Sequence, residues 1–225
     1  MKIWESLLLA FSTLLPIINP IGSALVFLGL VGDAPPAVYR TLARKIAINN
    51  IIFLAIFELL GSSILNFFGL SLPIVQVAGG LVIASLGWRM LNQPDAQTTA
   101  KSKQEEADSC LDNPRSELIQ KSFYPFTFPV TSGPGTLVVT LTLSAHASHT
   151  LLADNVMGHV GLFLAIVVLS VAVYFCYAYA PRITQAVAPS TVHGILRVMA
   201  FIVLSIGVQI AWNGFSTLYS QLVKP

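Results

Sequence analysis

Long stretches with almost no charged side chain recur along the chain and are separated by short polar segments. The hydrocarbon core of a bilayer, about 30 Å thick, is crossed by a helix of roughly 20 apolar residues, and each stretch is long enough for one crossing. The pattern therefore predicts an all-α, polytopic membrane protein. Its six expected spans are residues 7–31, 46–68, 72–91, 123–145, 155–180 and 195–219.

The composition agrees with this pattern, because 55% of the 225 residues are hydrophobic and only 10% are charged. A soluble domain carries about 25% charged residues. The segment 92–122 is the exception, since it collects many of the acids and bases of the chain. We expect a hydrophilic cytoplasmic loop there, between a first three-helix repeat over 1–91 and a second over 123–225.

Lysine and arginine are distributed unequally about the expected spans. Ten of the twelve lie in the first, third and fifth connections or at the adjoining helix ends, and only Lys2 and Lys224 lie on the other side. Positively charged residues accumulate on the cytoplasmic side of membrane proteins. The distribution therefore predicts that both termini are in the periplasm.

Proline and glycine interrupt the first and the fourth span at corresponding places, 16–22 and 129–135. The third and sixth spans also match, because 82–87 resembles 202–207 at an offset of 120 residues. Three spans per half is an odd number, so the second half enters the bilayer from the opposite side. We predict two inverted repeats whose broken helices meet near the midplane, where such transporters bind their substrates.

The two interruptions carry groups that suit an anion. A helix that restarts at Pro20 after a capping Asn19 presents amides with partial positive charge, and such an end stabilises a carboxylate. The alternative is that the prolines only kink the helices for packing. The substrate-binding residues predicted at the two interruptions are Asn19, Pro20, Gly22, Thr131, Ser132, Gly133 and Gly135.

Glu58 is the one acid well inside an expected span. A carboxylate inside the bilayer is costly and is by default a functional candidate, as a proton carrier or as a cation ligand. We predict that Glu58 couples transport to an ion; the alternative is a side chain that reaches the interface or pairs with a polar neighbour. The residues predicted to line the solute pathway are Asn49, Gln76, Arg197 and Gln209.

Other chemistry has less support in the sequence. His146, His149, Asp154 and His159 cluster around one short connection, but no metal site is predicted there. The chain carries no nucleotide-binding loop and no basic patch with interleaved aromatic residues, so we expect neither a cofactor nor a nucleic-acid partner. The expected partners are a small solute, a proton or a sodium ion, and membrane lipid.

Four motifs, each tied to one span, resemble those of the MarC family. They are the Asn19-Pro20 break after Pro16, Ala78-Gly79-Gly80, the Gly133-Pro134-Gly135 break after Pro129, and Arg197 followed by Met199 and Gly207. The resemblance runs from about residue 6 to 216, apart from the segment 92–117. It implies a six-helix protein of the bacterial inner membrane and, for some members, transport of neutral amino acids.

Two positions depart from the pattern of that family. Relatives commonly carry an arginine just before the Ala-Gly-Gly motif, where this chain has Gln76, and Ala200 replaces an expected glycine. The first departure bears on the substrate, because the family's arginine could hold an anionic group there.

Three classes of function remain open from the sequence. The leading hypothesis is a secondary transporter driven by an ion gradient, since no nucleotide-binding motif is present. The second is a structural or regulatory membrane subunit that transports nothing. The third and least supported is a membrane enzyme, because thiol–disulfide chemistry needs paired cysteines at the breaks, whereas Cys110 and Cys176 lie apart.

Overall fold

The computed structural model describes residues 3–32, 34–92, 122–147, 152–182 and 189–223. Every regular element in these ranges is a helix. The elements are α1 (Ile3–Ile18), α2 (Pro20–Val31), α3 (Pro36–Phe67), α4 (Leu72–Asn92), η1 (Ser122–Thr131), α7 (Pro134–Ala147), α8 (Leu152–Ala178) and α10 (Pro189–Val223). The predicted hydrophilic loop, 92–122, lies outside the described residues except at its two ends.

Each expected span coincides with one helix or with two consecutive helices. The span 7–31 is formed by α1 and α2, and 123–145 by η1 and α7. The helices α3 and α10 begin earlier than the expected spans, at Pro36 and Pro189. Proline suits a first helical position because it has no amide hydrogen and its φ angle is already helical. The extra turns of α3 are amphipathic and include Arg40 and Arg44.

Four described helical segments are long and apolar enough to cross a membrane: Ile3–Val31 taken across its break, Leu72–Asn92, Val156–Ala178 and Gly194–Val223. A shorter apolar helix covers Pro134–Ala145. The fold is therefore that of an all-helical, polytopic membrane protein.

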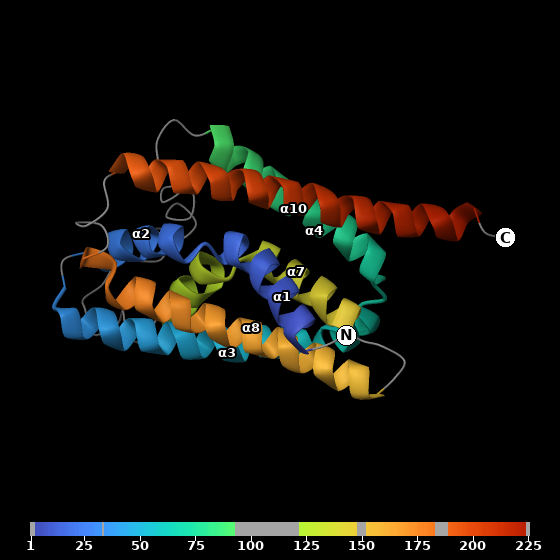
Figure 1. Ribbon diagram of the computed structural model, residues 1–225, viewed down its shortest axis with the longest axis horizontal. Coiled ribbons are helices and arrows are strands. Elements are labelled where there is room, and N and C mark those ends of the chain that lie inside the picture. Colours follow the sequence, from blue (N-terminus) through green and yellow to red (C-terminus); the bar gives the residue numbers. More distant parts are fainter. Residues whose placement is uncertain (1–2, 33, 93–121, 148–151, 183–188, 224–225) are drawn as a thin grey trace.

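The helices are arranged in three layers (Figure 1). The pair α3 and α8 forms one outer layer, the pair α4 and α10 forms the other, and the broken segments α1–α2 and η1–α7 lie between them. The last turns of α10 extend past the rest of the bundle. The interrupted helices thus occupy the middle of the molecule, where their exposed backbone groups are shielded from lipid.

The outer pair α3 and α8 runs antiparallel. Asn50 of α3 bonds to Ser170 of α8, and Glu58, eight residues further along α3, bonds to His159, which lies earlier in α8. Both contacts join polar side chains inside the layer. The pair is therefore held by two polar contacts as well as by apolar packing.

Glycines bring the backbones of α4 and α10 into direct contact. A Cβ atom added at Gly87 would lie 2.5 Å from the backbone N of Leu204, and one added at Gly207 would lie 2.8 Å from Cα of Ala84. Small residues allow such close approach of membrane helices. These two contacts are reciprocal, because 84 and 87 on α4 correspond to 204 and 207 on α10 at the offset of 120 seen in the sequence.

Candidate functional site

The first interruption is a single residue. Asn19 adopts the left-handed backbone conformation, with φ 45° and ψ 70°, while Pro20 begins α2. The side-chain oxygen of Asn19 accepts a hydrogen bond of 3.1 Å from the backbone amide of Gly22. Asn19 therefore caps α2 in the way that the Asn-Pro pair predicts.

Gly22 leaves the space that this cap needs. A Cβ atom at Gly22 would lie 2.9 Å from Cγ of Asn19, inside normal contact distance. The backbone amide of Gly22 that donates to this cap is one of the amides predicted to bind a solute carboxylate. In this conformation the protein's own side chain satisfies that amide.

The second interruption is longer and less regular. The segment η1 is kinked, because two of its residues, Tyr124 and Phe128, lie outside helical dihedral angles. The helix ends at Thr131, the chain turns at Ser132 and Gly133, and α7 begins directly afterwards. A Cβ atom at Gly133 would lie 3.3 Å from the carbonyl oxygen of Pro129, a tight contact that glycine avoids.

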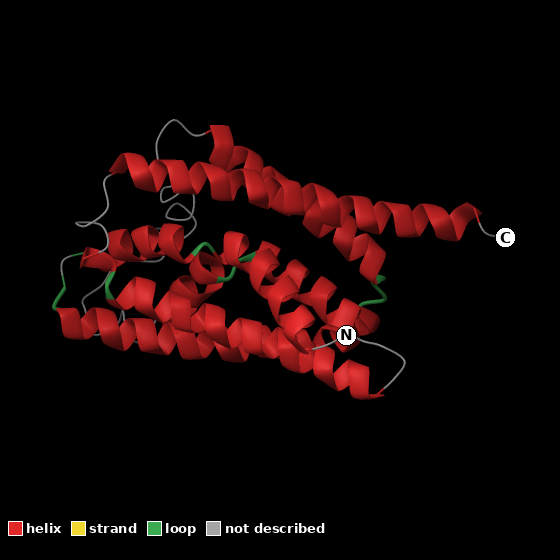
Figure 2. Cartoon of the chain, in the orientation of Figure 1, coloured by secondary structure: helices red, strands yellow, loops and turns green. Residues whose placement is uncertain are grey.

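The two interruptions lie against each other in the middle layer. The hydroxyl of Ser23, in the first turn of α2, lies 2.8 Å from the carbonyl oxygen of Ile18 and 3.2 Å from that of Val130 in η1. At Gly135, a Cβ atom would lie 3.7 Å from Cγ2 of Ile17 in α1. The broken segments therefore run antiparallel, and Figure 2 shows their two short loop segments near the centre of the bundle.

Hydroxyl and amide side chains tie this junction to the outer pair α3 and α8. Thr131 and Tyr177 place their hydroxyl oxygens 2.9 Å apart. The hydroxyl of Ser132 donates to Oδ1 of Asn50 at 2.6 Å, and Nδ2 of Asn50 donates to the hydroxyl of Ser170 at 2.9 Å. All five residues are buried. These bonds hold the junction closed in this conformation.

Aromatic rings cover the junction on the side of α2. The rings of Phe27 and Tyr177 stack with centroids 4.5 Å apart, and Phe126 meets Phe27 edge-on at 5.6 Å. Such ring pairs stabilise by about 1 kcal/mol beyond their buried area. Opening the junction on this side would separate elements that these rings hold together.

Glu58, the residue predicted to couple an ion, is buried beside a titratable partner. Its side chain is 1% exposed, and its Oε1 lies 2.5 Å from Nδ1 of His159 on α8. The hydroxyl of Ser144 on α7 donates to the main-chain oxygen of Glu58 at 2.6 Å. Eight residues of α3 separate Glu58 from Asn50, a rise of about 12 Å. The pair is thus a second polar centre, apart from the junction.

The four residues predicted to line a pathway are not brought together. Asn49 is half-buried and donates a hydrogen bond of 3.3 Å to η1. Gln76 is buried between α4 and its neighbours, whereas Arg197 and Gln209 lie on exposed faces of α10. Of these four residues, Gln76 borders the larger of two hollows near α4, α7 and α10.

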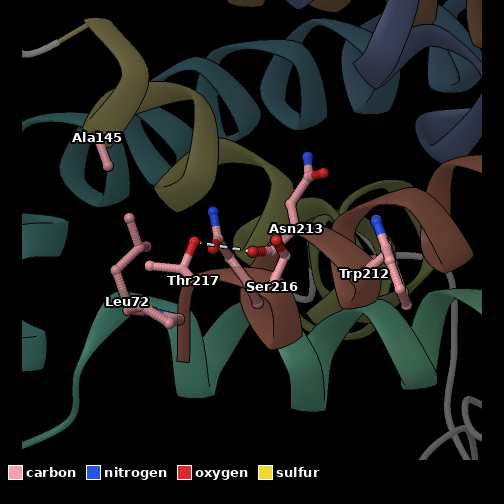
Figure 3. A pocket seen from close by; sticks show the side chains of 8 residues that line it. Leu72, Ala145, Trp212, Asn213, Ser216 and Thr217 are labelled. Carbon is pink, nitrogen blue, oxygen red and sulfur yellow. Dashed lines mark hydrogen bonds between the residues drawn. The ribbon is translucent and has the colours of Figure 1, made fainter. Parts of the chain in front are cut away.

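That hollow has a volume of about 550 Å³ and lies between α4, α7 and α10 (Figure 3). The residues that line it are Leu72, Pro73, Gln76, Ala145, Trp212, Asn213, Ser216 and Thr217. A smaller hollow of about 130 Å³ shares Leu72 and Ala145 and also reaches Ser144, the residue bonded to Glu58. The lining of the larger hollow offers amides, hydroxyls and an indole but no charged side chain.

A family model described as "MarC family integral membrane protein" matches residues 4–219. This chain belongs to the MarC family. The inner membrane protein MarC of Salmonella typhimurium is 27% identical to it over 217 residues, which cover 95% of this chain and 96% of that protein. Those of Citrobacter koseri and Escherichia coli O1:K1 are each 29% identical, over 219 and 220 residues, with the same coverage.

Membership of the MarC family makes the chain a multi-pass protein of the bacterial inner membrane. The resemblance read from the four sequence motifs is confirmed. No solved structure matches the chain.

Two site residues of this MarC chain were missed by the sequence analysis. His159 was grouped with a short connection, but α8 begins at Leu152, so His159 lies in its second turn and reaches Glu58 across 101 residues of sequence. Ser170 had no local signal at all. The placements of His146, His149 and Asp154 fall outside the described side chains, and among those described no group of acids, histidines and cysteines is placed to hold a metal.

Proposed function

We propose that this MarC-family chain is a secondary transporter, driven by an ion gradient, that carries a small solute without net charge, such as a neutral amino acid, across the inner membrane. The observation that carries the proposal is the contact between the two helix interruptions, where the Ser23 hydroxyl of one lies 3.2 Å from the Val130 oxygen of the other. Discontinuous helices that meet inside a bundle are the usual form of a transporter's substrate site.

Two inverted three-helix halves, 1–91 and 123–225, move against each other in this proposal. A two-fold axis in the membrane plane requires equivalent helices to run antiparallel, and all three layers pair helices of the two halves in that way. The reciprocal contacts of Gly87 and Gly207 support the same symmetry. Six spans and the distribution of basic residues then put both termini in the periplasm.

The junction would recognise the solute when it opens. The hydroxyls of Ser23 and Ser132 now bind oxygen atoms of the opposite half, those of Val130 and Asn50, and separation of the halves would offer both hydroxyls to a solute carboxylate. The carbonyl oxygen of Val130 would be released at the same time to accept from an ammonium group. The hollow between α4, α7 and α10, which has no charged lining residue, suits the entry of a solute without net charge.

Uptake by proteoliposomes tests this proposal. Purified protein is reconstituted, proton and sodium gradients are imposed separately, and accumulation of radiolabelled glycine and alanine is measured. We expect gradient-driven accumulation that Pro20→Ala reduces at least tenfold. Alanine at position 20 allows Asn19 to become helical, which would join α1 and α2 into one continuous helix and remove the interruption.

Pro36→Ala is the matched control. Pro36 also begins a helix, but it is exposed and is the first residue of α3, away from either interruption. We therefore expect unchanged uptake. Equal uptake by Pro20→Ala and the wild type would count against a substrate site at the interruption.

A second candidate function is a membrane subunit that transports nothing. It is favoured by the hydrogen bonds within the chain that satisfy Asn19, Thr131 and Ser132 without a ligand. Absence of uptake and of glycine or alanine binding to well-folded protein, measured by calorimetry, would support this candidate over transport of neutral amino acids.

A further inference from the structure

The contact between Glu58 and His159 joins the two halves of the chain inside the bundle. Glu58 lies on α3 and is 1% exposed, whereas the His159 side chain on α8 is 24% exposed. A buried carboxylate within the membrane needs a partner or a proton, because hydrocarbon does not solvate its charge. The Glu58 side chain is therefore enclosed by the protein, whereas the His159 side chain is partly exposed.

Few other charged groups face this pair. On α3 the nearest described base is Lys45, thirteen residues away, or about 20 Å along the helix. On α8 the nearest other described titratable side chain is Tyr174, about 22 Å away. On α1, Glu5 is exposed beside the residues that pack on Gly161. The side chains of His146 on α7 and Asp154 on α8 are outside the described part of the chain.

We propose that Glu58 and His159 form a proton-binding site, and that a proton is the ion whose gradient drives the transport proposed above. The coupling role rests on that transport function, whereas proton binding by the pair does not. The geometry suits a proton because Oε1 and Nδ1 are 2.5 Å apart, a hydrogen-bond distance that requires a proton between them.

A sodium ion fits the same atoms poorly. Hard cations take several oxygen ligands, and an imidazole nitrogen is a poor substitute. Here the nitrogen of His159 already occupies one carboxylate oxygen of Glu58, and the nearby hydroxyl of Ser144 is directed to the main-chain oxygen. A sodium ion would have to displace His159 before it could bind.

The charge of the pair changes by one unit in the cycle. With one proton between them and the second imidazole nitrogen unprotonated, the carboxylate and the neutral imidazole together carry one negative charge. Uptake of one further proton from one side of the membrane, through the partly exposed His159, gives a pair with no net charge. Its release to water on the other side restores the negative charge. The neutral pair is the form that moves through a low-dielectric interior at lower cost.

Infrared difference spectroscopy of the purified protein in lipid tests proton binding without a solute. A pH series reports the carboxylic acid through its carbonyl stretch and the imidazole through its ring modes. We expect a buried carboxylic acid band and a set of imidazole bands that change together over one pH range. Glu58→Gln should abolish that carboxylic acid band, and His159→Gln should move its pH midpoint. Glu5→Gln, an exposed acid of the same type, should leave the buried band and its midpoint unchanged.

Two results would overturn the proposal. The first is a Glu58-dependent band that does not respond to pH over the range in which circular dichroism shows folded protein. The second is loss of the band when sodium replaces potassium at constant pH, which would make the pair a sodium site. His159→Gln also gives a test if Glu58→Gln fails to fold.

The uptake assay separates this proposal from the transport function. If wild-type protein accumulates glycine or alanine with a sodium gradient alone, the result supports transport and contradicts proton coupling. If it accumulates neither solute, transport of glycine and alanine is contradicted. The infrared spectra still decide whether the pair binds a proton. Accumulation with a proton gradient alone, together with a pH-dependent Glu58 band, supports both.

Discussion

Asn19 offsets two unfavourable features of the first interruption with one side chain. The left-handed conformation costs a residue with a Cβ atom roughly 1–2 kcal/mol, and asparagine is among the few that tolerate it. An uncapped helix start costs about 1 kcal/mol more. We expect Asn19→Ala to lower the free energy of unfolding by about 2 kcal/mol, since alanine tolerates the left-handed conformation less well than asparagine and also loses the cap. Titration of purified protein with sodium dodecyl sulfate, followed by circular dichroism, measures the change.

Asn19→Gly separates the two features. Glycine adopts positive φ angles without strain and is an acceptable cap, so the loss should stay below about 1 kcal/mol. Equal losses for the alanine and glycine variants would mean that the backbone conformation of residue 19 does not contribute.

Local sequence was sufficient to predict some site residues but not others. The Asn19-Pro20 pair specifies a cap and a helix start within two residues, and Glu58 is conspicuous as an acid in an apolar run. The partner of Glu58 could not be predicted in this way. His159 meets it only because α3 and α8 pack together, and that pairing depends on the packing of whole helices.

At the scale of elements, the closeness of α4 and α10 depends on glycines. A methyl group at Gly207 would collide with the backbone of Ala84, so Gly207→Ala must push the two helices apart. We expect a loss of about 1–3 kcal/mol in the free energy of unfolding, typical of overpacking. The same detergent titration measures it.

Gly194→Ala is the control on the same helix. No atom lies within 4 Å of a Cβ placed at Gly194. Alanine there should raise stability by up to about 1 kcal/mol through its helix propensity. If both substitutions changed stability in the same direction, close packing at Gly207 would not be the cause.

The positions of the helices follow from the hydropathy pattern more closely than their internal geometry does. Both breaks were expected from proline and glycine, and both are present. The extended backbone at Tyr124 and Phe128 in η1 was not expected, because Pro125 and Pro129 predict only that regular helix fails there. The start of α3 at Pro36 was not predicted either. The hydropathy pattern marks only the part of a helix that crosses the bilayer, and α3 is longer than that part.

For the whole molecule, the proposed arrangement of two inverted halves predicts which side of the membrane each helix end occupies. Ser220, near the end of α10, should face the periplasm, and Thr41, near the start of α3, should face the cytoplasm; both are small and exposed. In a chain carrying Cys110→Ser and Cys176→Ser, a membrane-impermeant maleimide should label Ser220→Cys in intact cells. It should label Thr41→Cys only after the inner membrane is broken.

Labelling of both cysteines in intact cells would rule out the proposed topology, and so would labelling of Thr41→Cys alone. The sequence predicts the proposed two-half organisation through matched proline breaks and the offset of 120 between the third and sixth spans. It could not show that equivalent helices pair with each other, because apolar faces of six similar helices are compatible with several arrangements.

Asn50 and Ser170 are 120 residues apart, the same offset that relates α4 to α10. In a two-fold arrangement, a position that touches its own equivalent lies on the axis. If the halves descend from one gene whose product paired with a second copy of itself, this position once met an identical residue. Such self-pairing favours a side chain that both donates and accepts, as amides and hydroxyls do. Fusion into one chain removes the requirement for identity, and the unlike pair of Asn50 and Ser170 would then be a trace of an ancestral homodimer.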